Sequence, residues 1–367
     1  MESLTQELVT PEQTDETKLI REYQVSSLLQ ESKSDATDSE SNISDSNDSG
    51  SMNEQTIERL YQSVARTIVT DFPLPNDQME QLKQIGFEFT GKLGNGIFGI
   101  VYKCKLTQNK GGIMEVTELA CKKVTLSNDS KFEQQLKKNQ LPLVTKCEHP
   151  NLTDMFEIYI HYNINNLHPT TALMFTELCT GNLMEFKLSH LKGYMTEKQA
   201  GRWFIQIAYG LQYLHFSVKD HYPSDGPMIK KMMPIVHGLI SERNILYKGT
   251  NPYLFKLADF SLGELLKSED ENVSDIIRED IYKLSKVLSN SVLLRSRAET
   301  IINDIHYSMK DTSQLMHEYK LSSELIELIR KMSQPDQSNR PDINEVIDNP
   351  WVEPFNKLYR PTGIQFN

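Results

Sequence analysis

Three glycines lie close together at 94–99 and could surround a phosphate group. Gly94, Gly96 and Gly99 form a G-x-G-x-x-G pattern. Glycine lets the backbone approach phosphate oxygens closely and present its N–H groups to them. The pattern alone is a weak signal, and a dinucleotide-binding fold would require a helix directly after it. Ile100 and Val101 indicate a strand there instead, which favours a hairpin that covers a phosphate.

A lysine follows this glycine turn at the end of a second strand-like segment. Lys122 lies 23 positions after Gly99, directly behind Ala120 and Cys121. A lysine at the end of a strand can reach phosphate oxygens as a point charge. The alternative is a surface lysine beside Lys123. The glycine turn and the lysine together favour the phosphate role.

Two side chains further along the chain carry oxygen atoms that suit a divalent cation. They are Asn244 and Asp259, and Mg²⁺ prefers carboxylate, carbonyl and phosphate oxygens. For Asp259 the alternative is a residue that only caps a turn. Phe260 beside it favours contact with a metal or a nucleotide.

The elements that must position these residues change in character along the chain. Strand-like segments lead from Phe87 through the glycine turn to Lys122, and residues 171–178 have the pattern of a buried strand. Residues 196–215 carry a long amphipathic helical pattern. A strand-rich first half followed by a helix-rich second half is typical of the α+β class.

The first part of the chain has the composition of a disordered tail. Residues 31–50 contain seven serines, six acidic residues and one basic residue. Such a segment cannot bury enough apolar surface to offset its ordering entropy. We interpret it as a solvated leader rather than a cluster of phosphoacceptor serines. Apolar residues at helical spacing from Ile57 to Ile68 then predict a short helix, which docks either on the domain itself or on a partner.

Composition and charge argue against several classes of protein. The formal net charge of −11 opposes nucleic acid or an anionic membrane as the main partner. The four cysteines form no C-x-x-C pair, which favours reduced thiols over disulfides or zinc. The start of the chain has no signal-peptide pattern, and no apolar run approaches the roughly 20 residues that span a bilayer. We therefore expect a cytoplasmic or nuclear protein.

Seven motifs appear in the order found in the protein-kinase superfamily, which this chain therefore resembles from Phe87 to Trp351. They are HPNL at 149–152, ELC at 177–179, QIAYGLQYLH at 206–215, LADFS at 257–261, DIYKL at 280–284, NRP at 339–341 and NPW at 349–351. The resemblance implies a bilobal fold with a small β-rich lobe and a larger helical lobe.

This resemblance also implies a division of the chain into four parts. They are an acidic tail at 1–50, a helix and linker at 51–84, a kinase-like domain at 85–354 and a C-terminal tail at 355–367. Within the domain, the N-lobe would span 85–178 and the C-lobe 179–354.

A nucleotide pocket for ATP, with or without Mg²⁺, is a further implication of the resemblance. Thr176 takes the gatekeeper position, and Glu177 to Cys179 resembles the hinge that holds adenine. Cys179 itself is most simply a small buried apolar residue. The residues expected to contact the nucleotide are Gly94, Gly96, Gly99, Val101, Ala120, Lys122, Thr176, Glu177 and Cys179. The expected metal ligands are Asn244 and Asp259.

The sequence departs from the family at the loop that carries catalysis. HGLISERNIL at 237–246 stands where the family has HRDLKxxNIL. Aligned on His237 and Asn244, Leu239 replaces the catalytic aspartate and Ser241 replaces the lysine. Leucine cannot accept the proton of a substrate hydroxyl, a role worth roughly 10²–10⁴-fold in rate. We expect His237 to be a packed structural residue, and Asp280 to hold the backbone of this loop.

Other departures concern regulation. Gly238 replaces the arginine that pairs with a phosphorylated activation loop, and no APE triplet lies between Asp259 and Asp280. Arg340 therefore needs a carboxylate other than the APE glutamate, and the sequence does not name it. In active members of the family, the strand lysine pairs with a glutamate on the helix of the small lobe. Counted back from His149, the position of that glutamate falls on Gln140, within a stretch at 131–145 that is mostly helical in character.

An insertion at 216–236 stands where the family has a very short connection. Its first half has the composition of a turn-rich loop. Methionines follow, and we interpret them as packing residues rather than a contact surface.

These observations predict a pseudokinase that binds ATP and acts as a scaffold or allosteric regulator of another signalling protein. One alternative is an atypical active Ser/Thr kinase in which another carboxylate, such as Glu242, replaces the missing base. The second alternative is an interaction module with an empty cleft.

Overall fold

The computed structural model describes fourteen stretches of the chain. They are residues 82–83, 86–96, 99–110, 112–125, 147–162, 169–191, 194–221, 229–232, 234–250, 252–260, 264–265, 273–293, 295–308 and 310–359. The expected acidic tail, the helix predicted at 57–68 and the segment 131–145 with Gln140 lie outside these residues.

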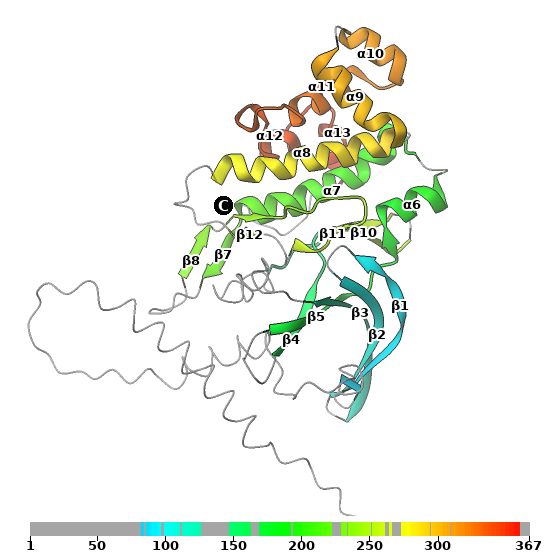
Figure 1. Cartoon of the computed structure of the whole chain (residues 1–367), viewed down its shortest axis with the longest axis vertical. Coiled ribbons are helices and arrows are strands. Elements are labelled where there is room, and N and C mark those ends of the chain that lie inside the picture. The colour runs from blue at the N-terminus through cyan, green and yellow to red at the C-terminus, as the bar shows by residue number, and fades with distance from the viewer. Residues whose placement is uncertain are drawn as a thin grey trace, which may run out of the picture.

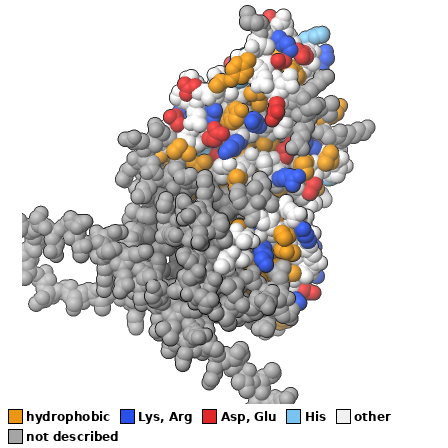
Figure 2. All heavy atoms as spheres, viewed as in Figure 1, with side chains coloured by type: hydrophobic (Ala, Val, Ile, Leu, Met, Phe, Trp, Pro, Cys, Tyr) orange, Lys and Arg blue, Asp and Glu red, His pale blue; other side chains and the backbone are white. Residues whose placement is uncertain are grey.

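The described residues form two lobes, as the resemblance implied (Figure 1). One lobe is an antiparallel sheet in the order β1-β2-β3-β5-β4, and the other consists mainly of helices. Figure 2 shows cationic and anionic side chains interspersed over the described part of the helical lobe. Within the described residues, no helix is both long and apolar enough to cross a bilayer.

The sheet of the first lobe packs one face into a small apolar core. Its strands are β1 Phe87–Gly96, β2 Gly99–Lys110, β3 Ile113–Thr125, β4 Met155–Tyr162 and β5 Pro169–Glu177. Successive side chains of a strand alternate between its two faces, so every second residue enters the core. Phe87, Cys121 and Phe175 lie in this core, and the centres of the Phe87 and Phe175 rings are 4.3 Å apart.

Eight helices, within the described residues, build the second lobe. They are α6 Leu183–His190, α7 Glu197–Phe216, α8 Val273–Val292, α9 Arg295–Tyr307, α10 Thr312–Tyr319, α11 Ser323–Met332, α12 Ile343–Ile347 and α13 Glu353–Tyr359. A short 3-10 helix, η2, spans Gln337–Asn339.

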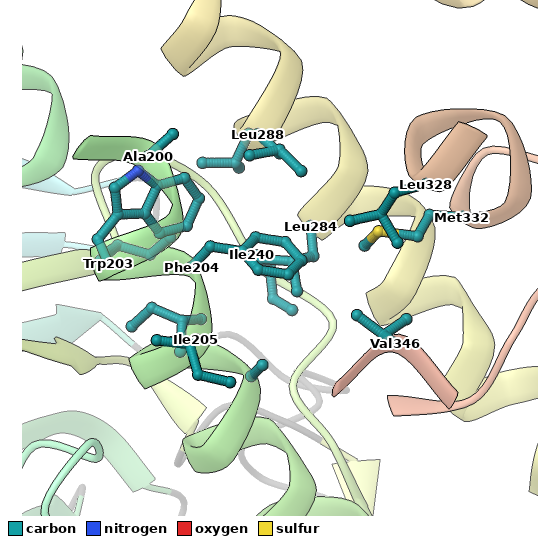
Figure 3. Packing of buried hydrophobic residues seen from close by; sticks show 14 of the residues in the cluster. Ala200, Trp203, Phe204, Ile205, Ile240, Leu284, Leu288, Leu328, Met332 and Val346 are labelled. Atoms are coloured by element: carbon teal, nitrogen blue, oxygen red, sulfur yellow. The ribbon is translucent and has the colours of Figure 1, made fainter. Parts of the chain in front are cut away.

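The long helix α7 lies at the centre of this lobe and begins at a capping box. The Thr196 hydroxyl accepts the Gln199 N–H at 3.3 Å, and the Gln199 side chain accepts the Thr196 N–H at 2.9 Å. Its apolar face packs against α8, α12 and α13. Figure 3 shows Trp203 and Phe204 of α7 close to Leu284 and Leu288 of α8. The amphipathic pattern predicted at 196–215 is therefore the core of the helical lobe.

Several short strands accompany the helices of the second lobe. β6 Gly181–Asn182, β10 Ile245–Lys248 and β11 Leu254–Leu257 form a sheet in the order β11-β10-β6, and β9 Ile235–Val236 pairs with β12 Glu264–Leu265. The residues 237–244 between β9 and β10 are those predicted to form the catalytic loop. We refer to them as the 237–244 loop.

The insertion after α7 does not begin as the expected turn-rich loop. Val218–His221 forms β7, which pairs antiparallel with β8 Ile229–Met232. Lys219 and Asp220 have low strand propensity, so no local pattern signals these strands. The antiparallel pairing of the two segments, in which His221 lies opposite Ile229, supplies the structure instead.

The C-terminal residues also differ from the expected tail at 355–367. α13 includes residues 355–359, and it packs on α7. A Cβ atom at Gly201 would lie 2.2 Å from the Phe355 ring, so glycine makes room for that ring. The Tyr209 hydroxyl also donates a hydrogen bond to Asn356. The helical lobe therefore extends to at least Tyr359.

The carboxylate that pairs with Arg340 comes from α8. The Arg340 Nη1 donates to Glu279 Oε2 at 2.8 Å, and the guanidinium also contacts the Gln334 carbonyl at 2.7 Å. The Cζ atom of the Arg340 guanidinium lies 4.7 Å from the centre of the Tyr282 ring. The side chain of Arg340 is 6% exposed, so this pair compensates a nearly buried charge without any APE glutamate.

A buried carboxylate joins the two lobes at the end of β5. Glu177 accepts hydrogen bonds from the Asp154 N–H at 3.0 Å, from Lys248 of β10 at 2.8 Å and from Lys256 of β11. Lys256 is itself buried and also donates to the Leu152 carbonyl at 3.1 Å. Burial raises the pKa of Glu177, but the hydrogen bonds from Lys248, Lys256 and Asp154 outweigh it and hold this pKa below its ordinary value.

Replacing Glu279 by glutamine should lower the free energy of unfolding by about 1–2 kcal/mol, because Arg340 then keeps a hydrogen bond but loses its carboxylate. Urea unfolding at neutral pH measures this change. The exposed Glu324→Gln variant is the matched control and should leave stability nearly unchanged. Equal stabilities of the two variants would show that Arg340 needs no ion pair.

Glu177→Gln should lower the free energy of unfolding at pH 7 by about 1–3 kcal/mol, because it leaves the buried Lys256 without its carboxylate. A carboxyl group with a lowered folded pKa stabilises the fold above its unfolded pKa of about 4.3, and this stabilisation is lost as pH falls through the folded pKa. Wild-type stability should therefore fall more steeply than that of Glu177→Gln below about pH 4.3. Urea titrations across this range test the difference. The exposed Glu299→Gln variant should follow the wild type, and parallel curves for all three proteins would contradict the assignment.

Candidate functional site

A buried carboxylate anchors the start of the 237–244 loop. Asp280 of α8 is fully buried and accepts the N–H groups of His237 and Gly238, each at 2.8 Å. His215 Nε2 lies 3.1 Å from the same carboxylate. Burial raises the pKa of Asp280, but the hydrogen bond and charge of His215 and the loop N–H groups outweigh it and lower this pKa overall. Asp280 thus holds the loop backbone, as expected.

His237 is a packed structural residue. It is fully buried, its Nδ1 accepts the Leu239 N–H at 3.1 Å, and its Nε2 lies 2.8 Å from the Ala258 carbonyl. This arrangement requires the neutral ring with its proton on Nε2. Burial lowers the pKa of His237, which agrees with a neutral imidazole. His237 therefore ties the loop to the segment that carries Asp259.

Leu239 occupies a well-formed loop but offers no proton acceptor. Its N–H donates to His237, and its carbonyl accepts the Asn244 side-chain N–H at 2.8 Å. The Ser241 carbonyl accepts the Asn244 backbone N–H at 3.0 Å. These contacts involve main-chain atoms at positions 239 and 241, so they do not depend on which side chains those positions carry. The loop keeps its shape with a leucine in the place of a carboxylate.

Glu242, the carboxylate considered as a substitute base, is committed elsewhere. Its Oε1 forms an ion pair with Lys187 of α6. Lys187 is buried and also donates to the Asn290 carbonyl at 2.7 Å. Turning Glu242 toward the cleft would leave a buried ammonium without its carboxylate, which is costly. This geometry disfavours Glu242 as a base.

Lys122 and Asp259 meet across the two lobes although 137 positions separate them. The Lys122 Nζ lies 2.6 Å from the Asp259 Oδ2. Lys122 is buried on β3, and Asp259 is partly exposed. The backbone φ of Asp259 is 67°, a left-handed conformation that costs free energy for residues other than glycine and often occurs at functional sites. The structure thus brings together the predicted phosphate lysine and a predicted metal ligand.

Sheet register places four of the expected nucleotide residues on one face. Val101 is paired with Lys122, and Ala120 is paired with Thr176. Side chains of cross-strand partners share a face, and so do residues two apart in a strand. Val101, Ala120, Lys122 and Thr176 therefore lie on the side opposite the aromatic core. Because Lys122 contacts Asp259, this face looks toward the helical lobe.

The three glycines have different roles in the hairpin of β1 and β2. A Cβ atom at Gly99 would lie 1.9 Å from the Lys123 carbonyl oxygen, so the sheet itself requires glycine there. No atom lies within 4 Å of a Cβ atom built at Gly94, and packing gives no reason for glycine at this position. Gly96 is paired with Gly99 at the end of the ladder. Packing within the described residues thus explains the glycine at position 99 but not the one at position 94.

The predicted hinge residues differ in what they can offer a ligand. Thr176 is partly exposed on the sheet face that carries Lys122. The Glu177 carboxylate is committed to Lys248 and Lys256, so only its main chain is available for a nucleotide. Cys179, which was expected to be buried, is only partly buried. Burial, and secondarily the charge of Glu177, raise the pKa of Cys179 to about 11, so it is a neutral thiol at physiological pH.

The described residues do not form a ready site for Mg²⁺. The Ala258 N–H donates to the Asn244 carbonyl at 2.8 Å, so the two predicted ligands belong to neighbouring segments. The Asp259 carboxylate, however, is already paired with Lys122, and the Asn244 amide is turned to the Leu239 carbonyl. Within the described residues, no group of three His, Cys, Asp or Glu side chains could hold a metal ion. This arrangement of the described residues fits Mg²⁺ poorly.

Sequence reasoning missed two groups that surround the predicted site. The first group is the pair of lysines that bind Glu177, namely Lys248 of β10 and Lys256 of β11. Neither lysine belongs to a recognisable motif, although both alternate with apolar residues and so lie on one side of those strands. The Lys187–Glu242 pair joins α6 to the 237–244 loop. Neither set of contacts can be predicted from local residue spacing, because the residues involved come from different elements.

Comparison with known proteins agrees with this architecture. The model of the protein kinase domain matches residues 87–293, more than half of the 367 residues. Serine/threonine-protein kinase Nek4 of Mus musculus is 24% identical over 300 residues, which cover 76% of this chain and 34% of that protein. Probable serine/threonine-protein kinase MARK-C of Dictyostelium discoideum is 23% identical over 305 residues, covering 76% and 35% of the two chains.

A plant relative gives the same result. Serine/threonine-protein kinase Nek6 of Oryza sativa subsp. japonica is 23% identical over 291 residues, which cover 73% of this chain and 48% of that protein. The chain thus spans about a third to a half of the length of the curated relatives that it matches. The two lobes, the motif order and the match to the domain model lead to one conclusion. The chain belongs to the protein kinase family.

Proposed function

We propose that this protein is a pseudokinase: a kinase-fold regulator that binds ATP but does not transfer its phosphate. Leu239 carries this proposal. It stands in an intact 237–244 loop at the position where an active kinase places the aspartate that receives the substrate proton. Loss of a positioned base costs roughly 10²–10⁴-fold in rate. Ser241 also lacks the positive charge that would stabilise the transferring phosphoryl group.

The surroundings of the loop support the same proposal. Glu242 is paired with the buried Lys187, and Asp280 is buried beneath the loop backbone. Asp259 is paired with Lys122. Each of these three carboxylates has a structural partner, so none is held ready as a substitute proton acceptor.

The nucleotide side of the cleft supports retained binding. Val101, Ala120, Lys122 and Thr176 share one face of the sheet, and Lys122 presents an ammonium group at the depth of the cleft. Gly94 leaves room for a close approach to the backbone. Apolar strand residues around a point charge suit the base and the phosphates of ATP.

As a pseudokinase, the protein would act as a scaffold or allosteric partner of another signalling protein in the cytoplasm or the nucleus. Bound ATP would set the relative position of the lobes, because Lys122 and Asp259 come from different lobes. The second candidate is an atypical active Ser/Thr kinase, and it is favoured by the matched relatives, which are named as serine/threonine-protein kinases.

Purified protein should transfer no phosphate from ATP to itself or to a general protein substrate above the background rate. The missing base and the missing loop lysine both raise the barrier. A radiolabelled transfer assay measures this, with Asp259→Asn as the matched control, because it removes the carboxylate that holds Mg²⁺ in active protein kinases. Transfer by the wild type that Asp259→Asn abolishes would overturn the pseudokinase proposal and establish the active kinase.

ATP should raise the melting temperature of the wild type, and Lys122→Ala should remove most of this shift. At a ligand concentration of 100 times Kd, binding adds about 2.7 kcal/mol of stability. Lys123→Ala is the matched control, because adjacent strand residues point to opposite faces, and it should keep the shift. Thermal denaturation with and without millimolar ATP gives the result. An unshifted wild type would favour the interaction module with an empty cleft.

A further inference from the structure

The start of β3 extends beyond both neighbouring parts of the sheet. β3 pairs with β2 from Ile113 to Val124, but its pairing with β5 begins only at Leu119. On the other side, the pairing of β1 with β2 reaches no further than Leu106. Among the described strands, residues Ile113–Glu118 therefore pair with β2 alone. We refer to Ile113–Glu118 as the projecting segment of β3.

Three apolar side chains of the projecting segment are exposed to water. Ile113 is 74% exposed, Met114 is 62% exposed and Val116 is 56% exposed. Because residues of a strand alternate between its faces, Met114 and Val116 lie on the face that carries Lys122, and Ile113 lies on the opposite face. Single exposed apolar residues are ordinary, but three within four positions indicate an interaction surface.

A partner that covers these residues must reach both faces of the strand. A helix laid on one face could cover Met114 and Val116, but it would leave Ile113 in water. A strand that pairs along the outer edge places its side chains beside those of β3 on both faces. It would also use the backbone N–H and C=O groups that an edge strand presents to solvent. The distribution of the apolar residues thus favours another strand as the partner.

A second copy of this chain carries a strand with complementary residues. When two identical strands pair antiparallel about a twofold axis, the residue at the axis lies opposite itself. With Glu115 at the axis, Met114 lies opposite Val116 of the second copy, and Ile113 lies opposite Thr117 of the second copy. Each contact occurs twice. This register pairs the two exposed apolar residues of one face with each other and places a β-branched residue against Ile113 on the other face.

We propose that the projecting segment of β3 is a self-association surface, through which two copies of this chain pair antiparallel about Glu115. The two Glu115 carboxylates meet at the axis, and like charges at opposite positions weaken a strand pair. The contact is also smaller than the roughly 1,200–2,000 Å² of a standard interface. We therefore expect a reversible dimer with a Kd on the order of 10–100 μM.

This surface is separate from the cleft between the lobes. The glycine turn lies beside Val124, at the other end of the pairing between β2 and β3. Lys122 follows Val116 by six positions, which corresponds to roughly 20 Å along a strand. Self-association would therefore leave the cleft of each copy open, and it does not depend on whether the cleft binds ATP.

Sedimentation equilibrium of the full chain between about 1 and 200 μM tests the proposal. The mean mass should rise from that of one copy toward that of two. Val116→Lys should stay monomeric, because a lysine on an edge strand opposes pairing. Leu358→Lys is the matched control, since Leu358 is 72% exposed on α13, and it should dimerise as the wild type does. A monomeric wild type would overturn the proposal, and so would a dimer that Val116→Lys leaves intact.

A cross-linking experiment on the full chain tests the register and does not depend on how Val116→Lys folds. Two cysteines at position 115 would lie directly opposite each other, within the Cα separation of about 4.4–6.8 Å that a disulfide accepts. Glu115→Cys should therefore form a covalent dimer under mild oxidation, whereas the wild type and Leu358→Cys should not. A reversible dimer without this cross-link would overturn the pairing about Glu115. Slow amide exchange at 113–118 in a monomeric wild type would show that the chain's own residues cover the segment, and would overturn it as well.

Discussion

The fully buried carboxylate of Asp280 determines the path of the chain between β9 and β10. Removing a charge from water is expensive, and it is tolerated here because His215 and two backbone N–H groups surround the oxygens. His237 then extends the contact to the Ala258 carbonyl, one position before Asp259. A single acid on α8 thus connects the 237–244 loop, the end of α7 and the segment beyond β11.

This anchoring acts on main-chain atoms, and that has a functional consequence. The loop is held through the N–H groups of positions 237 and 238 and through the carbonyls of positions 239 and 241. Side chains at 239 and 241 can therefore change without loss of the loop. A fold of this kind can lose a catalytic side chain and keep both its shape and its cleft, so fold and activity are separable.

Ion pairs between the lobes provide the second constraint. Glu177 joins β5 to Lys248 and Lys256, and Lys122 joins β3 to Asp259. Both contacts link residues of the sheet lobe to residues of the helical lobe at the edges of the cleft. A ligand that alters either pair changes how the lobes are held together. Arg340 and Glu279, in contrast, stabilise the helical lobe internally.

Much of the fold could be predicted from the sequence because its signals are local. Helix α7 follows from its apolar spacing and its capping residues, and β5 follows from a short apolar run. The β7–β8 hairpin could not be predicted, since its strand residues have weak propensity and gain their structure from each other. The partner of Arg340 could not be predicted either, because Glu279 lies 61 positions away in the sequence.

The sequence by itself determined the chemical types at the site: a lysine, an asparagine and an aspartate were present, and a leucine stood where a proton acceptor is needed. No tertiary structure can give that leucine a basic atom. Only the tertiary structure decided which charged groups are already engaged, with Asp259 held by Lys122, Glu242 by Lys187 and Glu177 by two lysines. The reason is physical: ion pairing depends on the distance between atoms that lie far apart along the chain, and no local pattern of residues encodes that distance.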